Sequence, residues 1–327
     1  MAPWFLDGVS VGQRVTKEWP VVNMADGSNV TLRSVVVRGY HDGPTLYIGA
    51  AIHGDEICGI EVMRQLLRTV DLKELHGTLV LVPVQNPWAF NERQRFLPAH
   101  AFDVFSVDIS NAFPGSPSGE VSQVLAYSIY EGFVRHCNFA VDLHAAMLGG
   151  MNLDYCFTPG GPDPKVVEAR RIARAFLLPM VMEQDGPGGY VGPAKLPQVA
   201  TLAGIPTFGV EFQEAGRATQ QSTQRGVAGF LNMMRLIGML CDQPSRPVVN
   251  QFIAHGFAYA RVERGGMYIP ELPLGSLVRK GERLGTLYGL DFSWEEPVLS
   301  PTGGLLYRTA MHRPINSSDR VASIAIQ

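Results

Sequence analysis

Between residues 45 and 241, two kinds of hydrophobic pattern follow one another along the chain. Short apolar runs of strand length, such as 45–51 and 77–84, are separated by segments whose apolar residues recur every three or four positions, as on one face of a helix. Because strands that alternate with helices form βαβ units, this pattern predicts an α/β fold with a parallel or mixed sheet flanked by helices. The predicted helices cover residues 57–70, 120–136, 165–176 and 223–241.

The two ends of the chain carry a different pattern. Residues 1–40 combine a β-branched run, "VVVRGY", with the turn "ADGSN", which indicates β structure. Beyond residue 244 the sequence consists of short apolar pieces between Gly and Pro residues, and "DQPSRPVV" is typical of a linker. We therefore expect one large domain over residues 1–243, which includes the N-terminal β segment, and a small all-β domain over residues 244–327.

The composition argues against several classes of function. Of the 327 residues, 46% are hydrophobic and 17% are charged, which is typical of a folded protein with a sizeable core. A formal net charge of −3 gives no attraction to nucleic acid, and no apolar stretch approaches the roughly 20 residues of a membrane helix. The N-terminus lacks a signal-peptide pattern, and the four cysteines form no CxxC pair. We expect a cytoplasmic protein with reduced thiols that binds neither nucleic acid nor membranes.

Polar residues end three of the predicted strands. His53 and Glu56 follow the strand at 45–51, His144 lies near the end of "NFAVDLHAA", and Glu211 lies near the end of "IPTFGVEF". Ligands gather at the carboxyl ends of strands in open α/β sheets, so these side chains are expected to converge. Two histidines and one carboxylate are a standard ligand set for catalytic zinc, which activates a water molecule for attack on a carbonyl. Glu211 is then our candidate for the residue that moves a proton from that water to a leaving nitrogen.

Each of these pieces also has a plainer interpretation. An HxxE or DLH sequence alone is a common polar end of a strand, and Glu211 alone could cap a helix or form a salt bridge. Glu214 is a rival for the role of Glu211. Asp142 is a candidate to orient His144 by a hydrogen bond, although we expect its side chain to leave the strand on the opposite face, and a purely structural hydrogen bond is the alternative. The joint occurrence of these residues at strand ends favours the metal site.

The ordered set of "HGDE", "NPWAFNERQRF", "DISNAFPG", "DLHA" and "GIPTFGVEF" resembles the succinylglutamate desuccinylase/aspartoacylase family, zinc amidohydrolases related to the zinc carboxypeptidases. The resemblance covers nearly the whole chain, including the C-terminal "GGMYIPELPLGSLVRKGERLG". It implies a zinc-carboxypeptidase-like mixed sheet flanked by helices, followed by a small β domain. It also implies that His53, Glu56 and His144 hold Zn²⁺ and that Glu211 is the general base.

One motif departs from the family pattern. The substrate-binding stretch of the family usually reads DLNRxFPG, whereas this chain has "DISNAFPG", which places Ser110 at the family's asparagine and Asn111 at its arginine. In the family that arginine anchors a carboxylate, and a neutral asparagine cannot replace its charge. Arg95 matches an upstream family arginine that could hold a carboxylate or stabilise an oxyanion, with a surface salt bridge as the alternative. We assign Arg95, Ser110 and Asn111 to substrate binding and keep Arg217 as a weaker candidate.

These observations lead to one main hypothesis and two alternatives. The main hypothesis is a zinc-dependent amidohydrolase that cleaves a small N-acyl amine or N-acyl amino acid, with a metal-activated water as nucleophile. A carboxypeptidase-like peptidase or an esterase would use the same chemistry. A metal-binding or ligand-binding relative without catalysis is permitted by the altered stretch at Asn111, but retention of all three ligands and of Glu211 speaks against it. The partner expected is a small-molecule substrate, and assembly into a homo-oligomer is left open.

Overall fold

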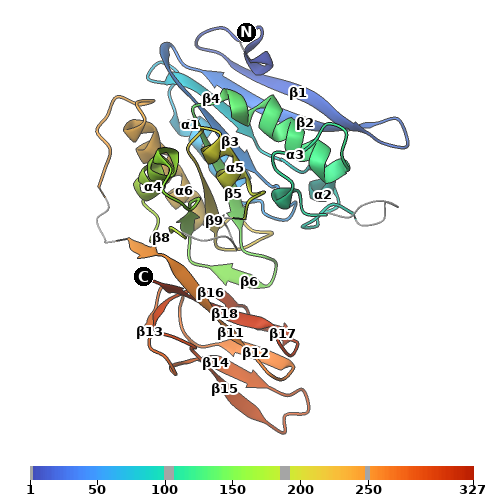
Figure 1. Cartoon of the computed structure of the whole chain (residues 1–327), viewed down its shortest axis with the longest axis vertical. Coiled ribbons are helices and arrows are strands. Elements are labelled where there is room, and N and C mark those ends of the chain that lie inside the picture. The colour runs from blue at the N-terminus through green and yellow to red at the C-terminus, as the bar shows by residue number, and fades with distance from the viewer. Residues whose placement is uncertain (1–2, 99–106, 185–191, 247–250) are drawn as a thin grey trace.

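The computed structural model describes residues 3–98, 107–184, 192–246 and 251–327 (Figure 1). Its largest element is a nine-stranded sheet in the order β1-β2-β4-β3-β5-β9-β7-β8-β10. The central strands β4, β3, β5 and β9 are mutually parallel, whereas β1–β2, β2–β4 and β7–β9 are antiparallel pairs. The predicted mixed sheet is therefore confirmed. Its strands are β1 (Arg14–Asn23), β2 (Asn29–Arg38), β3 (His41–Ala50), β4 (His76–Val82), β5 (Phe139–Ala145), β7 (Tyr155–Phe157), β8 (Met180–Met182), β9 (Thr207–Phe212) and β10 (Phe252–Ala254).

Helices cover both faces of this sheet. Alternate residues of β3 enter two separate cores: Leu46 and Ile48 belong to the cluster that includes α1, α4 and α6, whereas Tyr47 belongs to the cluster that includes α3 and α5. All three side chains are fully buried. The period-2 alternation of a strand thus gives two apolar layers around one sheet, as the α/β prediction requires. The helices are α1 (Cys58–Thr69), α3 (Val121–Gly132), α4 (Pro164–Ala175), α5 (Leu196–Leu202) and α6 (Gln220–Leu236).

Several predicted boundaries were wrong by a few residues. The helix expected over 120–136 ends at Gly132 and is followed by a separate 3-10 turn, Val134–His136. The helix expected over 223–241 begins at Gln220, because the Thr219 hydroxyl accepts a hydrogen bond from the amide of Ser222 at 3.1 Å and caps it. Between β4 and α3, the described residues of the stretch 85–119 include short helical elements. These are α2 (Pro87–Asn91) and the 3-10 turn η2 (Ile109–Asn111).

The C-terminal part of the chain forms two antiparallel sheets, as expected for an all-β segment (Figure 1). Each part of the molecule contributes one strand to a sheet of the other. Strand β10, from the C-terminal part, joins the nine-stranded sheet, and β6 (Gly150–Asn152), from the first part, pairs with β16 of the C-terminal part. Residues of the first part therefore reach the second sheet at β6. The remaining strands are β11 (Gly256–Arg261), β12 (Gly266–Pro270), β13 (Leu277–Val278), β14 (Arg283–Tyr288), β15 (Glu295–Leu299), β16 (Gly304–Ala310), β17 (Arg313–Ile315) and β18 (Arg320–Ile326).

The order of the central strands positions the predicted polar residues. β3, β5 and β9 are parallel neighbours, and Ala50 pairs with Leu143 while His144 pairs with Glu211. Their carboxyl ends therefore lie side by side at one edge of the sheet. Among the described residues, no helix is long and apolar enough to cross a membrane.

Candidate metal centre and substrate cavity

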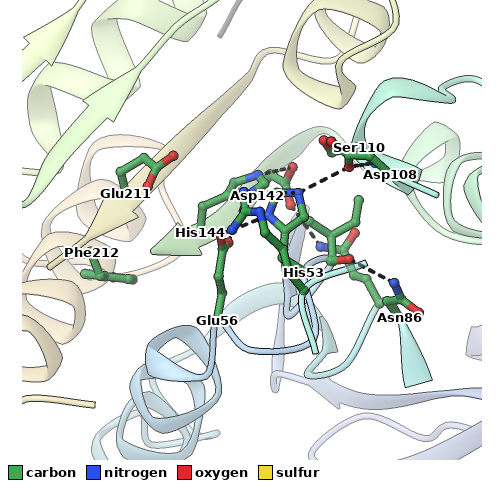
Figure 2. A network of polar contacts seen from close by, with 12 residues as sticks. His53, Glu56, Asn86, Asp108, Ser110, Asp142, His144, Glu211 and Phe212 are labelled. Carbon is green, nitrogen blue, oxygen red and sulfur yellow. Dashed lines mark hydrogen bonds and ion pairs between the residues drawn. The ribbon is translucent and has the colours of Figure 1, made fainter. Parts of the chain in front are cut away.

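His53, Glu56 and His144 form a buried triad at the carboxyl ends of β3 and β5, where His53 and Glu56 follow β3 and His144 is the last residue but one of β5 (Figure 2). Nδ1 of His53 lies 2.9 Å from Oε1 of Glu56, and Nδ1 of His144 lies 3.1 Å from Oε2 of the same carboxylate. The three ligand atoms lie within 4.8 Å of one another, and the exposed fractions of the residues are 4%, 1% and 8%. The sequence placed these residues at strand ends, and the structure brings them together.

The turn that carries His53 is held by its backbone. Ala51 has a φ of +48°, which turns the chain as β3 ends, and the side chain of Asn86 donates to the carbonyl of Ile52 at 3.2 Å (Figure 2). The amide of Gly54 donates to the carbonyl of Arg95 at 3.1 Å. A Cβ on Gly54 would lie 2.4 Å from backbone atoms of Ala89, so only glycine allows this close approach. The glycine of "HGDE" thus brings the Arg95 segment to the triad.

Each histidine makes a second contact with a carboxylate through its other nitrogen. Nε2 of His144 lies 2.9 Å from Oδ2 of Asp142, and Nε2 of His53 lies 3.2 Å from Oδ1 of Asp108. When Nε2–H donates to the carboxylate, the lone pair of Nδ1 faces the centre of the triad, which is the arrangement of metal-binding histidines. Sequence reasoning missed Asp108, although it begins the "DISNAFPG" motif.

The expectation for the direction of Asp142 was wrong. Residues two positions apart in a strand lie on the same face, so Asp142 and His144 leave β5 together. Asp142 is buried, and it also accepts a hydrogen bond from Nε2 of Gln85 at 2.8 Å. The hydroxyl of Tyr47 donates in turn to Oε1 of Gln85 at 3.2 Å. Asp142 is thus fixed from two sides and holds the ring of His144.

The donor set of the triad fits a divalent cation. Nδ1 of His53 is buried and, among the described residues, has no hydrogen-bond partner of good geometry, although Glu56 lies beside it. Burial alone would raise the pKa of Glu56, but the charges and hydrogen bonds of His53 and His144 hold that pKa well below its usual value. An ionised carboxylate and two imidazole nitrogens that converge in a water-poor site are the ligands that zinc and similar ions bind.

Glu211 lies on β9 beside His144 and faces the same edge of the sheet (Figure 2). Its Oε2 accepts a hydrogen bond from Nδ2 of Asn152 at 3.0 Å. Burial and the nearby charge of Glu56 raise the pKa of Glu211. Asn152 lies in β6 and pairs with Arg308 of β16, so the second sheet reaches the carboxylate through these two residues. Nothing in the local sequence pointed to Asn152.

The two rival residues lie elsewhere. Nη1 of Arg217 forms an ion pair with Oε2 of Glu214 at 3.6 Å, and the Arg217 side chain is 67% exposed. Neither residue lines the cavity next to the triad. By its position, Glu211 is therefore preferred over Glu214, and Arg217, the weaker candidate for substrate binding, forms a surface salt bridge instead.

The three predicted substrate residues have different surroundings. Arg95 donates to Glu56 through Nη1, and its guanidinium lines the cavity. The hydroxyl of Ser110 also lines it and accepts a hydrogen bond from Nζ of Lys195 at 2.8 Å. The exposed side chain of Asn111 instead donates to Oδ2 of Asp108 at 2.8 Å and does not line the cavity.

A cavity of about 220 Å³ opens onto the triad and Glu211. A larger hollow of about 680 Å³ lies between α1 and α6, but no residue of the triad lines it, so the smaller cavity is the candidate site for a substrate. Its walls combine the nine-stranded sheet with strands of the C-terminal part. Besides Asp108, the residues of the cavity wall that the sequence did not single out are Phe157, Lys195, Pro197, Tyr259, Arg308 and Arg320.

Comparison with known proteins gives the same assignment as the resemblance. Residues 42–237 match the succinylglutamate desuccinylase/aspartoacylase catalytic domain. The chain is 26% identical over 304 residues to the N-alpha-acetyl-L-2,4-diaminobutyric acid deacetylase of Halomonas elongata, covering 89% of this chain and 84% of that protein.

Two solved structures show the same fold. One is the product-bound ectoine utilization protein EutE (DoeB) from Ruegeria pomeroyi, with a TM-score of 0.82, 21% identity and coverage of 96% of this chain and 95% of that chain. The other is a succinylglutamate desuccinylase/aspartoacylase from Rhodobacter sphaeroides, with a TM-score of 0.81, 22% identity and coverage of 96% of both chains. The chain belongs to the succinylglutamate desuccinylase/aspartoacylase family, and it is an amidohydrolase that acts as a deacylase on a small molecule.

Proposed function

We propose that the protein is a zinc-dependent deacylase that hydrolyses the amide bond of a small N-acyl amine or N-acyl amino acid. The observation that carries this proposal is the convergence of two histidine Nδ1 atoms and one carboxylate in a buried site, with a second carboxylate on the neighbouring strand. Because such a site also suits other divalent ions, zinc is the expected metal on the basis of its ligand preference.

His53, Glu56 and His144 would hold the metal, with Asp108 and Asp142 orienting the two rings. Zinc in such a ligand set supplies a Lewis acid for the amide carbonyl and lowers the pKa of water to about 7. The residues of the chain would bind the substrate and transfer the protons. A substrate in the cavity would place its amide between the triad and Glu211.

Glu211 would act as the general base and then as the general acid. Its raised pKa suits both tasks, because the ionised carboxylate takes a proton from the attacking water and the protonated form gives it to the leaving nitrogen. The hydrogen bond from Asn152 keeps the carboxylate in place. Arg95, whose guanidinium reaches Glu56 and lines the cavity, would stabilise the negative oxygen that develops on the carbonyl.

The residues of the altered motif would take part in substrate binding to different degrees. Ser110 faces the cavity and can contact a substrate directly. Asn111 would act through Asp108, to which it donates a hydrogen bond. The name of the Halomonas elongata relative makes an N-acetylated diamino acid the first substrate to test, since 26% identity supports a related substrate without fixing it.

The division into domains stays a prediction. We retain a catalytic domain over residues 1–243 and a small β domain over 244–327 as a proposal. Whether the chain forms a homo-oligomer was left open, and light scattering on the purified protein would test it.

Elemental analysis of the purified protein tests the metal site, and an assay with N-alpha-acetyl-L-2,4-diaminobutyrate tests the reaction. We expect one zinc ion per chain in the wild type and in His312→Ala, which changes an exposed histidine of the C-terminal part. His53→Ala should contain none and should release no acetate. A wild type without metal, even after zinc has been supplied, would contradict the proposed chemistry.

A further inference from the structure

We propose that Lys195 binds a carboxylate of the substrate and so selects negatively charged N-acyl compounds. This inference rests on the proposed function and names the residue that gives the same site its charge preference. Asn111 carries no charge and donates to Asp108 outside the cavity wall, whereas Lys195 brings a cationic group into it. Lys195 lies 85 residues from Ser110 in the sequence but meets it in the cavity.

Lys195 is placed to contact a ligand. It precedes α5, and its half-buried side chain lines the cavity together with His53, His144 and Glu211. Nζ donates to the hydroxyl of Ser110 at 2.8 Å, which fixes the direction of the side chain. An ammonium group has three donors, so two remain for a ligand.

Among the described residues, Nζ of Lys195 forms no ion pair at contact distance, and Asp108, Asp142 and Glu211 act on its charge from farther away. Among these carboxylates, Asp108 has the strongest electrostatic effect on Lys195. Its oxygens already contact His53, the backbone amide of Ser110 and the side chain of Asn111. Burial lowers the pKa of Lys195, although Asp108 and Asp142 oppose this effect. A half-buried cation without an ion pair is costly, and a substrate carboxylate would offset that cost.

Two cations from the C-terminal part favour the same ligand. Arg308 in β16 and Arg320 in β18 line the wall that the C-terminal part contributes. The guanidinium of Arg320 lies over the ring of Tyr259 at 4.6 Å from its centroid. With Arg95 and Lys195, they face the carboxylates of the same cavity, which are Asp108, Asp142 and Glu211. The cations offset these negative charges and so favour entry of an anion, but they do not by themselves choose where its carboxylate binds. Lys195 would determine where the carboxylate binds, because it contacts Ser110 in the same cavity as His53 and His144.

Calorimetric titration separates this inference from the proposed function. The titrations use Glu211→Gln protein, in which turnover is slowed, with N-alpha-acetyl-L-2,4-diaminobutyrate and with its C-terminal amide, which lacks the carboxylate. A third ligand, the N-succinyl analogue of that amide, carries its carboxylate on the acyl side. When Lys195→Met is added, the ligand whose carboxylate Lys195 holds should lose affinity relative to the C-terminal amide by a factor on the order of 100. Loss of one partner of a buried charge pair has an effect of this size. The ligand that loses affinity shows on which side of the amide bond the carboxylate is held.

A second variant of Lys195 and a control at an exposed lysine test whether the charge of Lys195 causes the preference. Lys195→Gln can still donate to Ser110 but has no charge, so we expect it to lose the preference as Lys195→Met does. Lys165→Met, on the exposed face of α4, should keep the preference. An unchanged preference in Lys195→Met or Lys195→Gln would overturn the role of Lys195. If the preference is lost but the wild type hydrolyses none of the ligands, the anchor stands and the proposed deacylase substrate is wrong.

Discussion

The metal side and the substrate side of the cavity are built in different ways. On the metal side, His53, Glu56 and His144 are almost fully buried, and each histidine is held by a carboxylate behind it. On the substrate side, Lys195 and Ser110 come from distant segments, and a half-buried charge is without an ion pair among the described residues.

This difference separates chemistry from specificity. A metal ligand must keep its place within narrow limits, so each one is fixed by a strand, a turn and a hydrogen-bond partner. A group that recognises a substrate can be exchanged for another of similar charge from a different segment. Asn111 stands where the resemblance implied an arginine, while the triad beside it is intact, which is consistent with this view.

Glu211→Gln should give the largest effect that leaves the metal in place. The amide cannot accept the proton of the attacking water, so kcat/KM should fall by about 10²- to 10⁴-fold, while elemental analysis should find unchanged metal. Glu214→Gln is the matched control, because Glu214 pairs with Arg217 away from the cavity. Equal losses in the two variants would show that position on the cavity does not identify the base.

Asp142→Asn and Asp108→Asn test how strongly each aspartate holds its histidine on the metal side. Both changes weaken the hold on a histidine and should lower metal affinity by about 10- to 100-fold. The loss should be larger for Asp142, which is 2% exposed and lies 2.9 Å from its histidine, whereas the side chain of Asp108 is 22% exposed at 3.2 Å. Competition with a chelator measures both affinities, and a larger loss for Asp108 would contradict the ranking.

Asn152→Leu tests the point where the second sheet reaches the metal side, with the smallest expected effect. Asn152 donates to the carboxylate of Glu211, and this bond favours the ionised form. Its loss should raise the pKa of Glu211 further. Because the base works only when ionised, the acidic limb of kcat/KM should move to higher pH, with a rate near that of the wild type above that limb.

The pH profile of a second asparagine variant provides the control for Asn152→Leu. Asn232 is also buried, but its amide donates to the carbonyls of Ala175 and Ser245, far from the cavity wall. Asn232→Leu should therefore leave the acidic limb where it is in the wild type. A shift in both variants would indicate a general loosening of the fold.

The sequence by itself determined the α/β class, the family and the triad. These depend on local patterns: apolar runs of strand length give the sheet, and polar residues at the ends of parallel strands must meet at one edge. The position of Glu211 beside His144 follows from the same rule, since β5 and β9 are parallel neighbours.

Only the tertiary structure decided which other side chains surround that edge. Asp108 had a signal, as the acidic residue that opens a motif, but its contact with His53 depends on how a long connection folds back. Asn152, Lys195, Arg308 and Arg320 had no such signal. They reach the cavity because β6 pairs with β16 and because the segment before α5 packs against η2, and contacts between segments so far apart leave no period or spacing in the sequence.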